Sequence, residues 1–109
     1  MSNIYQIYLI SDSTGETLDR IFLALKAQFS NIEYKVHSYS FTRTENQIIK
    51  ILKTAKKNDN AIILYTIVDN NLAKFLANQS EDKGLPCFGV LGNLILSFSK
   101  LLNQKASHE

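Results

Sequence analysis

Polar residues with the chemistry to bind a phosphate group occur in three short segments of the sequence. In the first segment, hydroxyl side chains surround an aspartate and a glycine; its candidate residues are Ser11, Asp12, Ser13, Thr14, Gly15 and Thr17. Arg43, between two threonines, and Asp69 belong to the other two segments. Hydroxyl groups and a glycine allow the backbone to approach an anion, and an arginine can hold a phosphate through two parallel hydrogen bonds. One interpretation is therefore a phosphate-binding loop with Arg43 as its clamp.

The same residues also fit an ordinary structural interpretation. Ser13 or Thr14 is a favourable residue to cap a helix, and an aspartate such as Asp69 caps a helix more often than it acts as a base or a metal ligand. Arg43 is equally typical of a solvated surface charge. Asp12 would repel a phosphate unless it holds a metal ion, binds a sugar hydroxyl or points away. Both interpretations stay open, and we assign no catalytic residue and no metal ligand to the chain.

Two common nucleotide-binding motifs do not occur in the sequence. A P-loop needs the spacing Gly-x4-Gly-Lys-Ser/Thr, which is not found here. Gly15 has no second glycine near it, so the loop is not of the Gly-x-Gly-x-x-Gly type either. Residue spacing alone therefore gives no evidence for a nucleotide.

The candidate residues follow apolar runs that alternate with helical patterns along the chain. The predicted strands are residues 7–10, 33–39, 61–65 and 87–90. The runs 7–10 and 61–65 are continuously apolar, as in strands covered on both faces. Polar and apolar residues alternate in 33–39, which is typical of a half-exposed strand at a sheet edge.

Apolar residues at helical spacing predict a helix after each strand. The expected stripes are Leu18, Ile21, Phe22, Leu25 and Phe29, then Ile48, Ile51, Leu52 and Ala55, then Leu72, Phe75 and Leu76. Thr44 is the expected N-cap of the second helix, and Asp69 or Asn70 begins the third. In the fourth helix, from Leu91 to Leu102, apolar residues cover more of the helix circumference than one buried stripe requires. This predicts a further contact surface, for a second subunit in a homodimer or for another domain.

The alternation of strands and helices predicts a three-layer α/β fold around a four-stranded parallel sheet. An exposed second strand and right-handed crossovers favour the strand order 2-1-3-4, of the Rossmann-like or flavodoxin-like kind. In such sheets ligands bind beyond the C-terminal ends of the strands, at the point where the strand order reverses. Residues 11–15 and 66–70 would then form the two lips of a cleft, with residues 40–44 beside them.

The composition excludes several classes of protein. We expect the 109 residues, 45% of them hydrophobic and 20% charged, to form one α/β domain. The net charge of +2 argues against nucleic acid or a membrane surface as a partner. The single cysteine excludes an internal disulfide, and no stretch resembles a membrane span or a secretory signal. A cytoplasmic location is expected.

Four segments, in the right order and at the right spacing, resemble the bacterial pyruvate, phosphate dikinase regulatory proteins. This family also includes the phosphoenolpyruvate synthase regulatory proteins. The four segments are residues 10–17, 41–48, 64–69 and 84–88, and residues 91–94 and 107–109 match as well. The likeness covers essentially the whole chain and concerns the N-terminal part of the family's proteins.

The resemblance implies part of a bifunctional enzyme. Family members use ADP to phosphorylate a threonine of the dikinase or the synthase, which inactivates it, and they reverse this with inorganic phosphate, releasing pyrophosphate. Their nucleotide-binding P-loop lies in a C-terminal half that residues 1–109 do not include. We therefore expect the N-terminal domain of a two-domain serine/threonine kinase and phosphorylase, inactive alone and with no cofactor of its own. The positions that carry over are Ser11 to Gly15, Thr17, Arg43 and Asp69.

Two alternatives from other classes fit parts of the pattern. A flavodoxin-like FMN-binding domain has a phosphate loop at this point of the fold that resembles residues 13–17, although the absence of tryptophan and a basic isoelectric point argue against it. A docking module without chemistry would bind a protein but no phosphate compound. Asp12 has no second acidic residue beside it, so a magnesium-dependent phosphoacceptor site is not indicated.

Overall fold

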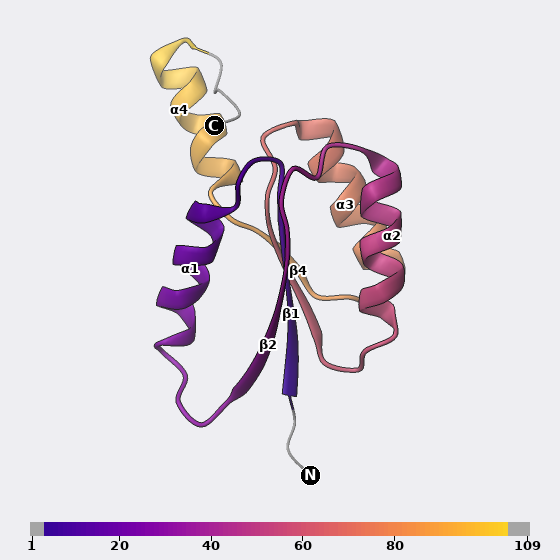
Figure 1. Ribbon diagram of the computed structural model, residues 1–109. Helices are drawn as coiled ribbons and strands as arrows, with labels where there is room; N and C mark the ends of the chain where they lie inside the picture. The colour runs from indigo at the N-terminus through magenta and orange to yellow at the C-terminus, as the bar shows by residue number, and fades with distance from the viewer. Residues whose placement is uncertain (1–3, 105–109) are drawn as a thin grey trace.

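Strands and helices alternate strictly along residues 4–104, the part of the chain that the computed structural model describes. The elements are β1 (Ile4–Ser11), α1 (Glu16–Lys26), β2 (Glu33–Tyr39), α2 (Glu45–Lys56), β3 (Ala61–Thr66), α3 (Asn70–Asp82), β4 (Cys87–Gly89) and α4 (Gly92–Leu102) (Figure 1). The strands form one parallel sheet in the order β2-β1-β3-β4. The predicted fold class and strand order are therefore confirmed.

Helices cover both faces of the sheet. Figure 1 shows α1 on one face and α2 with α3 on the other. Because successive side chains of a strand point to opposite faces, Tyr8 and Ile10 of β1 pack in the core under α2 and α3, whereas Ile7 and Leu9 pack under α1. All four are buried, which explains why this strand reads as a continuous apolar run.

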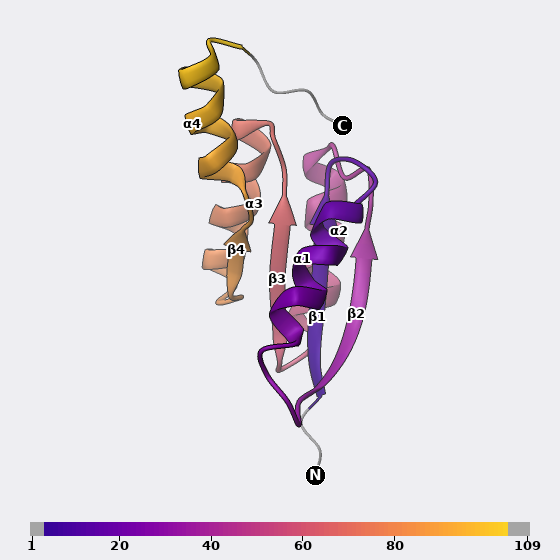
Figure 2. The ribbon, with the colours of Figure 1, turned by 90° about the vertical axis from the view of Figure 1, so that its left-hand side faces the viewer.

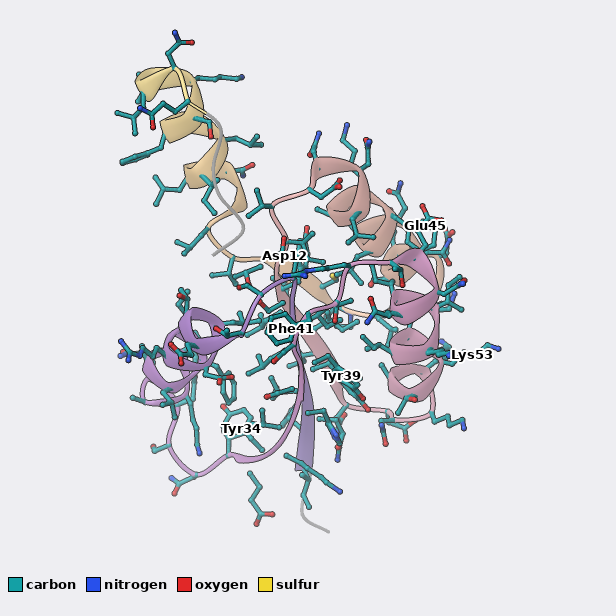
Figure 3. The ribbon with its side chains drawn as sticks, turned by 45° about the horizontal axis from the view of Figure 1, so that its top comes forward. Asp12, Tyr34, Tyr39, Phe41, Glu45 and Lys53 are labelled. Carbon is teal, nitrogen blue, oxygen red and sulfur yellow. The ribbon has the colours of Figure 1, made fainter. Side chains whose placement is uncertain are left out.

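The edge strand β2 also uses both faces, but more loosely. Tyr34 packs against the core under α1, and its ring meets the edge of the Phe22 ring at 5.5 Å between centroids. Tyr39 packs on the opposite core and stacks on Tyr8 at 6.2 Å. The two tyrosines lie on opposite sides of the sheet in Figure 3. The half-exposed character predicted for this strand is thus confirmed.

Local capping explains where α2 and α3 begin. The Thr44 hydroxyl accepts the N–H of Gln47, and the Gln47 side-chain oxygen accepts the N–H of Thr44, which makes a complete capping box. Asp69 caps α3 by accepting the N–H of Leu72 at 3.1 Å. Both predicted N-caps are confirmed.

The start of α1 differs from the prediction. Gly15, not Ser13 or Thr14, is the N-cap and has no side chain to cap the helix, although the Thr14 hydroxyl accepts the N–H of Glu16 at 3.4 Å. The backbone of Gly15 has φ of +86°, a left-handed conformation that glycine adopts without steric cost. The chain therefore turns into α1 through a glycine bend, and the Thr14 hydroxyl contributes a single long bond from the position before the N-cap.

The buried stripe of α1 is also shorter than its apolar pattern. Leu18 and Phe22 are buried, whereas Leu25 and Phe29 are exposed. The helix ends at Lys26, and the N–H of Phe29 bonds the carbonyl of Lys26 in a tight turn that leads toward β2. Phe29 therefore lies outside the helix, and its side chain does not join the buried stripe.

The last helix packs differently from the other three. No residue of α4 is buried, and its large apolar residues Leu94, Leu96, Phe98, Leu101 and Leu102 are all exposed. Figure 2 shows α4 extending past the ends of the strands, which gives the molecule its long axis of 52 Å against 30 and 21 Å. Among the residues described, no helix has the length and apolar character of a membrane span.

Replacing Ile48 by alanine tests the core between α2 and the sheet. Ile48 is fully buried, so Ile48→Ala should lower the free energy of unfolding by about 2–5 kcal/mol. Its neighbour Ile49 is 37% exposed, and Ile49→Ala should change stability by no more than about 0.5 kcal/mol. Urea unfolding of both variants measures the difference, and equal losses would contradict this description of the core.

Candidate functional site

Strand register brings three loops to one edge of the sheet. Ile10 of β1 pairs with Tyr39 of β2, and Ser11 pairs with Thr66 of β3, so the three strands end at the same level. The loops that follow are residues 12–15, 40–44 and 67–69. All three contain candidate residues, and they meet where the strand order reverses, as expected for a ligand site in this kind of sheet.

The loop after β2 is tied to the loop after β1 by backbone bonds. The N–H of Thr42 donates to the carbonyl of Ser11 at 2.8 Å, and the N–H of Phe41 donates to the carbonyl of Ser13 at 2.9 Å. The Ser40 hydroxyl donates to the carbonyl of Thr14 at 2.8 Å. These bonds extend the pairing of the two strands into their loops, so residues 11–14 have a defined backbone path.

Asp12 joins the first loop to the loop after β3. Its Oδ2 accepts the N–H of Val68 at 2.8 Å, and its own N–H donates to the carbonyl of Thr66 at 3.2 Å. The residue is only 5% exposed and lies where the loops meet (Figure 3). Of the alternatives left open for Asp12, the geometry favours a carboxylate directed to a backbone amide. Its first role is to connect two loops.

The hydroxyl of Ser11 is also used inside the structure. Its Oγ accepts the N–H of Ser13 at 3.1 Å and lies 3.3 Å from the hydroxyls of Ser13 and Thr66. Ser11 is buried, whereas Thr14 and Thr17 are exposed. The N–H of Glu16, the first residue of α1, donates to the Thr14 hydroxyl at 3.4 Å. Within the first segment, the groups accessible to a ligand are therefore the half-buried Ser13, the side chains of Thr14 and Thr17, and the next N–H groups of α1, which have no carbonyl partner in their own helix.

Arg43 is exposed but held at two points. Its Nε donates to the carbonyl of Asp12 at 3.0 Å, and its guanidinium carbon lies 5.3 Å from the centre of the Phe41 ring. Arg43, Asp12, Asp69 and Leu72 line a hollow of about 420 Å³. Arg43 can bind an anion in this hollow, and the carboxylate of Asp69 can accept a hydrogen bond from a hydroxyl group there.

The candidate residues do not line a single hollow. Ser13 and Thr17 line a smaller space of about 140 Å³, between the first loop and the start of α4. Asp12 borders both this space and the hollow of Arg43. Thr14 and Gly15 face a third, very small space on the side of β2. The structure thus brings Arg43 and Asp69 together and places the hydroxyl residues beside them.

A larger hollow of about 520 Å³ lies between α4 and the ends of β3 and α3. Its polar side chains are amides and hydroxyls and include Asn70, Asn93, Ser99 and Gln104. None of the described residues that line it is charged, and no sequence pattern indicates it. Within residues 4–104, no group of three or more histidine, cysteine, aspartate or glutamate side chains could hold a metal ion.

Cys87 is separate from this site, and its environment makes it a poor nucleophile. The residue is partly buried in β4, and burial raises the pKa of its thiol above the ordinary value. The protonated thiol therefore dominates at neutral pH.

Sequence reasoning missed several residues that shape the site. Gln47 bridges the loop to α2 through the N–H groups of Arg43 and Thr44, and its spacing from Thr44 is a recognisable capping signal. The contact between Asp12 and Val68 could not be recognised from the sequence, because Val68 takes part through its backbone N–H and not through its side chain. Phe41 belongs to the segment 41–48 that resembles the family, but no sequence signal indicates that its backbone has φ of +53°.

Comparison with known proteins identifies the family to which this chain belongs. The sequence model of the kinase/pyrophosphorylase family matches residues 7–109, so the chain belongs to that family. Its relatives carry the provisional name pyruvate, phosphate dikinase regulatory protein. One from Pelagibacter ubique is 78% identical over 108 residues, which are 99% of this chain and 39% of the relative. One from Geotalea uraniireducens is 38% identical over 97 residues, or 89% of this chain and 36% of the relative.

A third relative, from Geobacter metallireducens, bears the same provisional name. It is 34% identical over 103 residues, which are 94% of this chain and 38% of the relative. The chain thus spans less than two fifths of the length of each of these three relatives.

Asp12→Ala tests the connection between the first and third loops. The change removes a charged acceptor and leaves the N–H of Val68 without its partner, so the free energy of unfolding should fall by about 1.5–3 kcal/mol. Asp12→Asn keeps an acceptor oxygen and should lose less. Urea unfolding compares the two, and an alanine variant as stable as the wild type would show that this bond does not hold the loops together.

Proposed function

We propose that this chain is the N-terminal domain of a longer regulator of pyruvate, phosphate dikinase. The regulator would inactivate its target by ADP-dependent phosphorylation of a threonine and reactivate it with inorganic phosphate, releasing pyrophosphate. Membership of the kinase/pyrophosphorylase family over residues 7–109 is the observation that carries the proposal. The relatives' names support the dikinase as the target. Phosphoenolpyruvate synthase, which the family resemblance also allows, is the other candidate.

Two observations support a division of the work between this domain and the rest of the protein. The relatives are more than twice as long as the chain, and the sequence contains no P-loop. The nucleotide-binding loop would therefore lie in the remaining part, and the chain alone would be inactive. What this domain would contribute is an arginine and a set of backbone N–H groups at one edge of the sheet.

The chemistry of phosphoryl transfer explains why such a contribution is useful. The reaction depends mainly on positioning the reactants and neutralising the charge on the transferred group. Arg43 would neutralise charge on a phosphate or a phosphothreonine in its hollow. Asp69, which lines the same hollow, would accept a hydrogen bond from the threonine hydroxyl or from a protonated phosphate oxygen.

The activity test is Arg43→Ala in the full-length protein. Both phosphorylation and reactivation of the target should slow by about 100-fold, because in both reactions the positive charge of Arg43 would neutralise the transferred phosphoryl group. Lys53→Ala is the matched control, since Lys53 also carries a positive charge but points outward from α2, away from the loops (Figure 3). Unchanged rates in Arg43→Ala would exclude Arg43 from the active site.

The isolated chain allows a separate binding test. A ligand at 100 times its dissociation constant stabilises a protein by about 2.7 kcal/mol, which raises the melting temperature of so small a domain by several degrees. Phosphate or pyrophosphate should produce this shift in the wild type and in Lys53→Ala, but not in Arg43→Ala. A differential scanning fluorimetry panel with ADP, ATP, phosphate, pyrophosphate and FMN measures it.

The panel also separates the proposal from its alternatives. A shift with FMN that exceeds the shift with phosphate would favour a flavodoxin-like function. No shift with any compound would contradict an anion site in this domain and would favour a docking module.

A further inference from the structure

Phe41 has an unusual combination of backbone and environment. Its φ of +53° is a left-handed conformation, which a bulky side chain rarely adopts because its Cβ crowds the backbone. Its side chain is 52% exposed, so burial of the ring does not offset this strain. Among the described residues, the only other large apolar side chain with positive φ is Leu91, at the N-cap of α4.

Hydrogen bonds on both sides of the peptide hold Phe41 in this conformation. Its N–H donates to the carbonyl of Ser13 at 2.9 Å, and its carbonyl accepts Nε2 of Gln47 at 3.3 Å. Thr42, the next residue, is almost fully buried and bonds the carbonyl of Ser11. The surrounding structure therefore determines the bend at Phe41, and strain of this kind is concentrated at functional positions.

The bend has one visible effect on a neighbouring side chain. It places the Phe41 ring 5.3 Å from the guanidinium carbon of Arg43, within the range of a cation–π contact. On the other side, Nε of Arg43 donates to the carbonyl of Asp12. An exposed arginine normally samples many rotamers, but here an aromatic face and a carbonyl restrict it at two points.

We propose that Phe41 is the positioning residue of Arg43: its ring holds the guanidinium in the orientation that binds a phosphoryl group. This inference rests on the proposed function, because it takes the anion site at Arg43 as given. The ring itself would not contact the anion. Its effect would be to reduce the rotamer freedom that Arg43 loses on binding, which raises affinity without adding a contact.

The test is phosphate and pyrophosphate binding to the isolated chain, measured by calorimetry at constant ionic strength. Phe41→Ala should weaken binding by about two- to fivefold, the size expected from a cation–π contact at an exposed site. Phe41→Tyr should restore it, because a phenol ring keeps the aromatic face. Phe29→Ala is the matched control, since Phe29 is 56% exposed and lies beyond the far end of α1.

Two further measurements separate positioning from a structural role. Phe41→Asn suits the left-handed backbone, so it should melt no lower than the wild type while still binding phosphate more weakly. In Phe41→Ala the NMR signal of the Arg43 Nε–H should move, because it loses the ring current of Phe41. The signal of Arg20, the other arginine of the chain, should not move.

The outcomes distinguish this inference from the proposed function. If Phe41→Ala and Phe41→Asn bind phosphate as tightly as the wild type while Arg43→Ala does not bind, Phe41 has no positioning role and the anion site stands. If Phe41→Ala weakens phosphate binding but leaves the Arg43 Nε–H signal where it is in the wild type, Phe41 acts independently of Arg43 and the inference is overturned. If the wild type binds neither anion, the anion site and the inference both fail.

Discussion

The parallel pairing of β1 with β2 on one side and β3 on the other is the constraint on which the rest of the structure depends. This register ends three strands at one level, so the loops after them must meet. Two of these loops are then joined to the first, one through the backbone of Thr42 and the other through the carboxylate of Asp12. The site is therefore a consequence of sheet geometry more than of any single motif.

This dependence explains which features could be predicted from the sequence. Strand order followed from the alternation of patterns, and the caps at Thr44 and Asp69 could be recognised because each depends on residues three positions away. The exposure of Phe29 could not be foreseen, because it depends on where α1 ends relative to the strands. The bend at Phe41 could not be foreseen either, since it depends in part on bonds to residues about thirty positions away in the chain.

The polar residues fall into two groups, those that hold the loops together and those that lie at the surface. Ser11 and Asp12 use their side chains to join the ends of strands, although Asp12 also borders the hollow of Arg43. Arg43 and Asp69 lie at the surface of a hollow with their functional groups accessible. The first segment thus contains residues that connect strand ends, whereas the exposed polar side chains Arg43 and Asp69 lie on the two neighbouring loops. In the proposed kinase and pyrophosphorylase activities, Arg43 and Asp69 would face the reacting phosphate.

The two edges of the sheet restrict how a target polypeptide can be held. At one edge β4 has only three residues, which is too short to pair securely with an added strand. At the other edge β2 carries the exposed charges of Glu33 and Lys35, which discourage pairing with a further strand. Recognition by strand addition is therefore disfavoured at both ends of the sheet. A polypeptide that presents a threonine to this domain would be recognised by its side chains and local shape, through the loops and helices, and not by extending the backbone ladder.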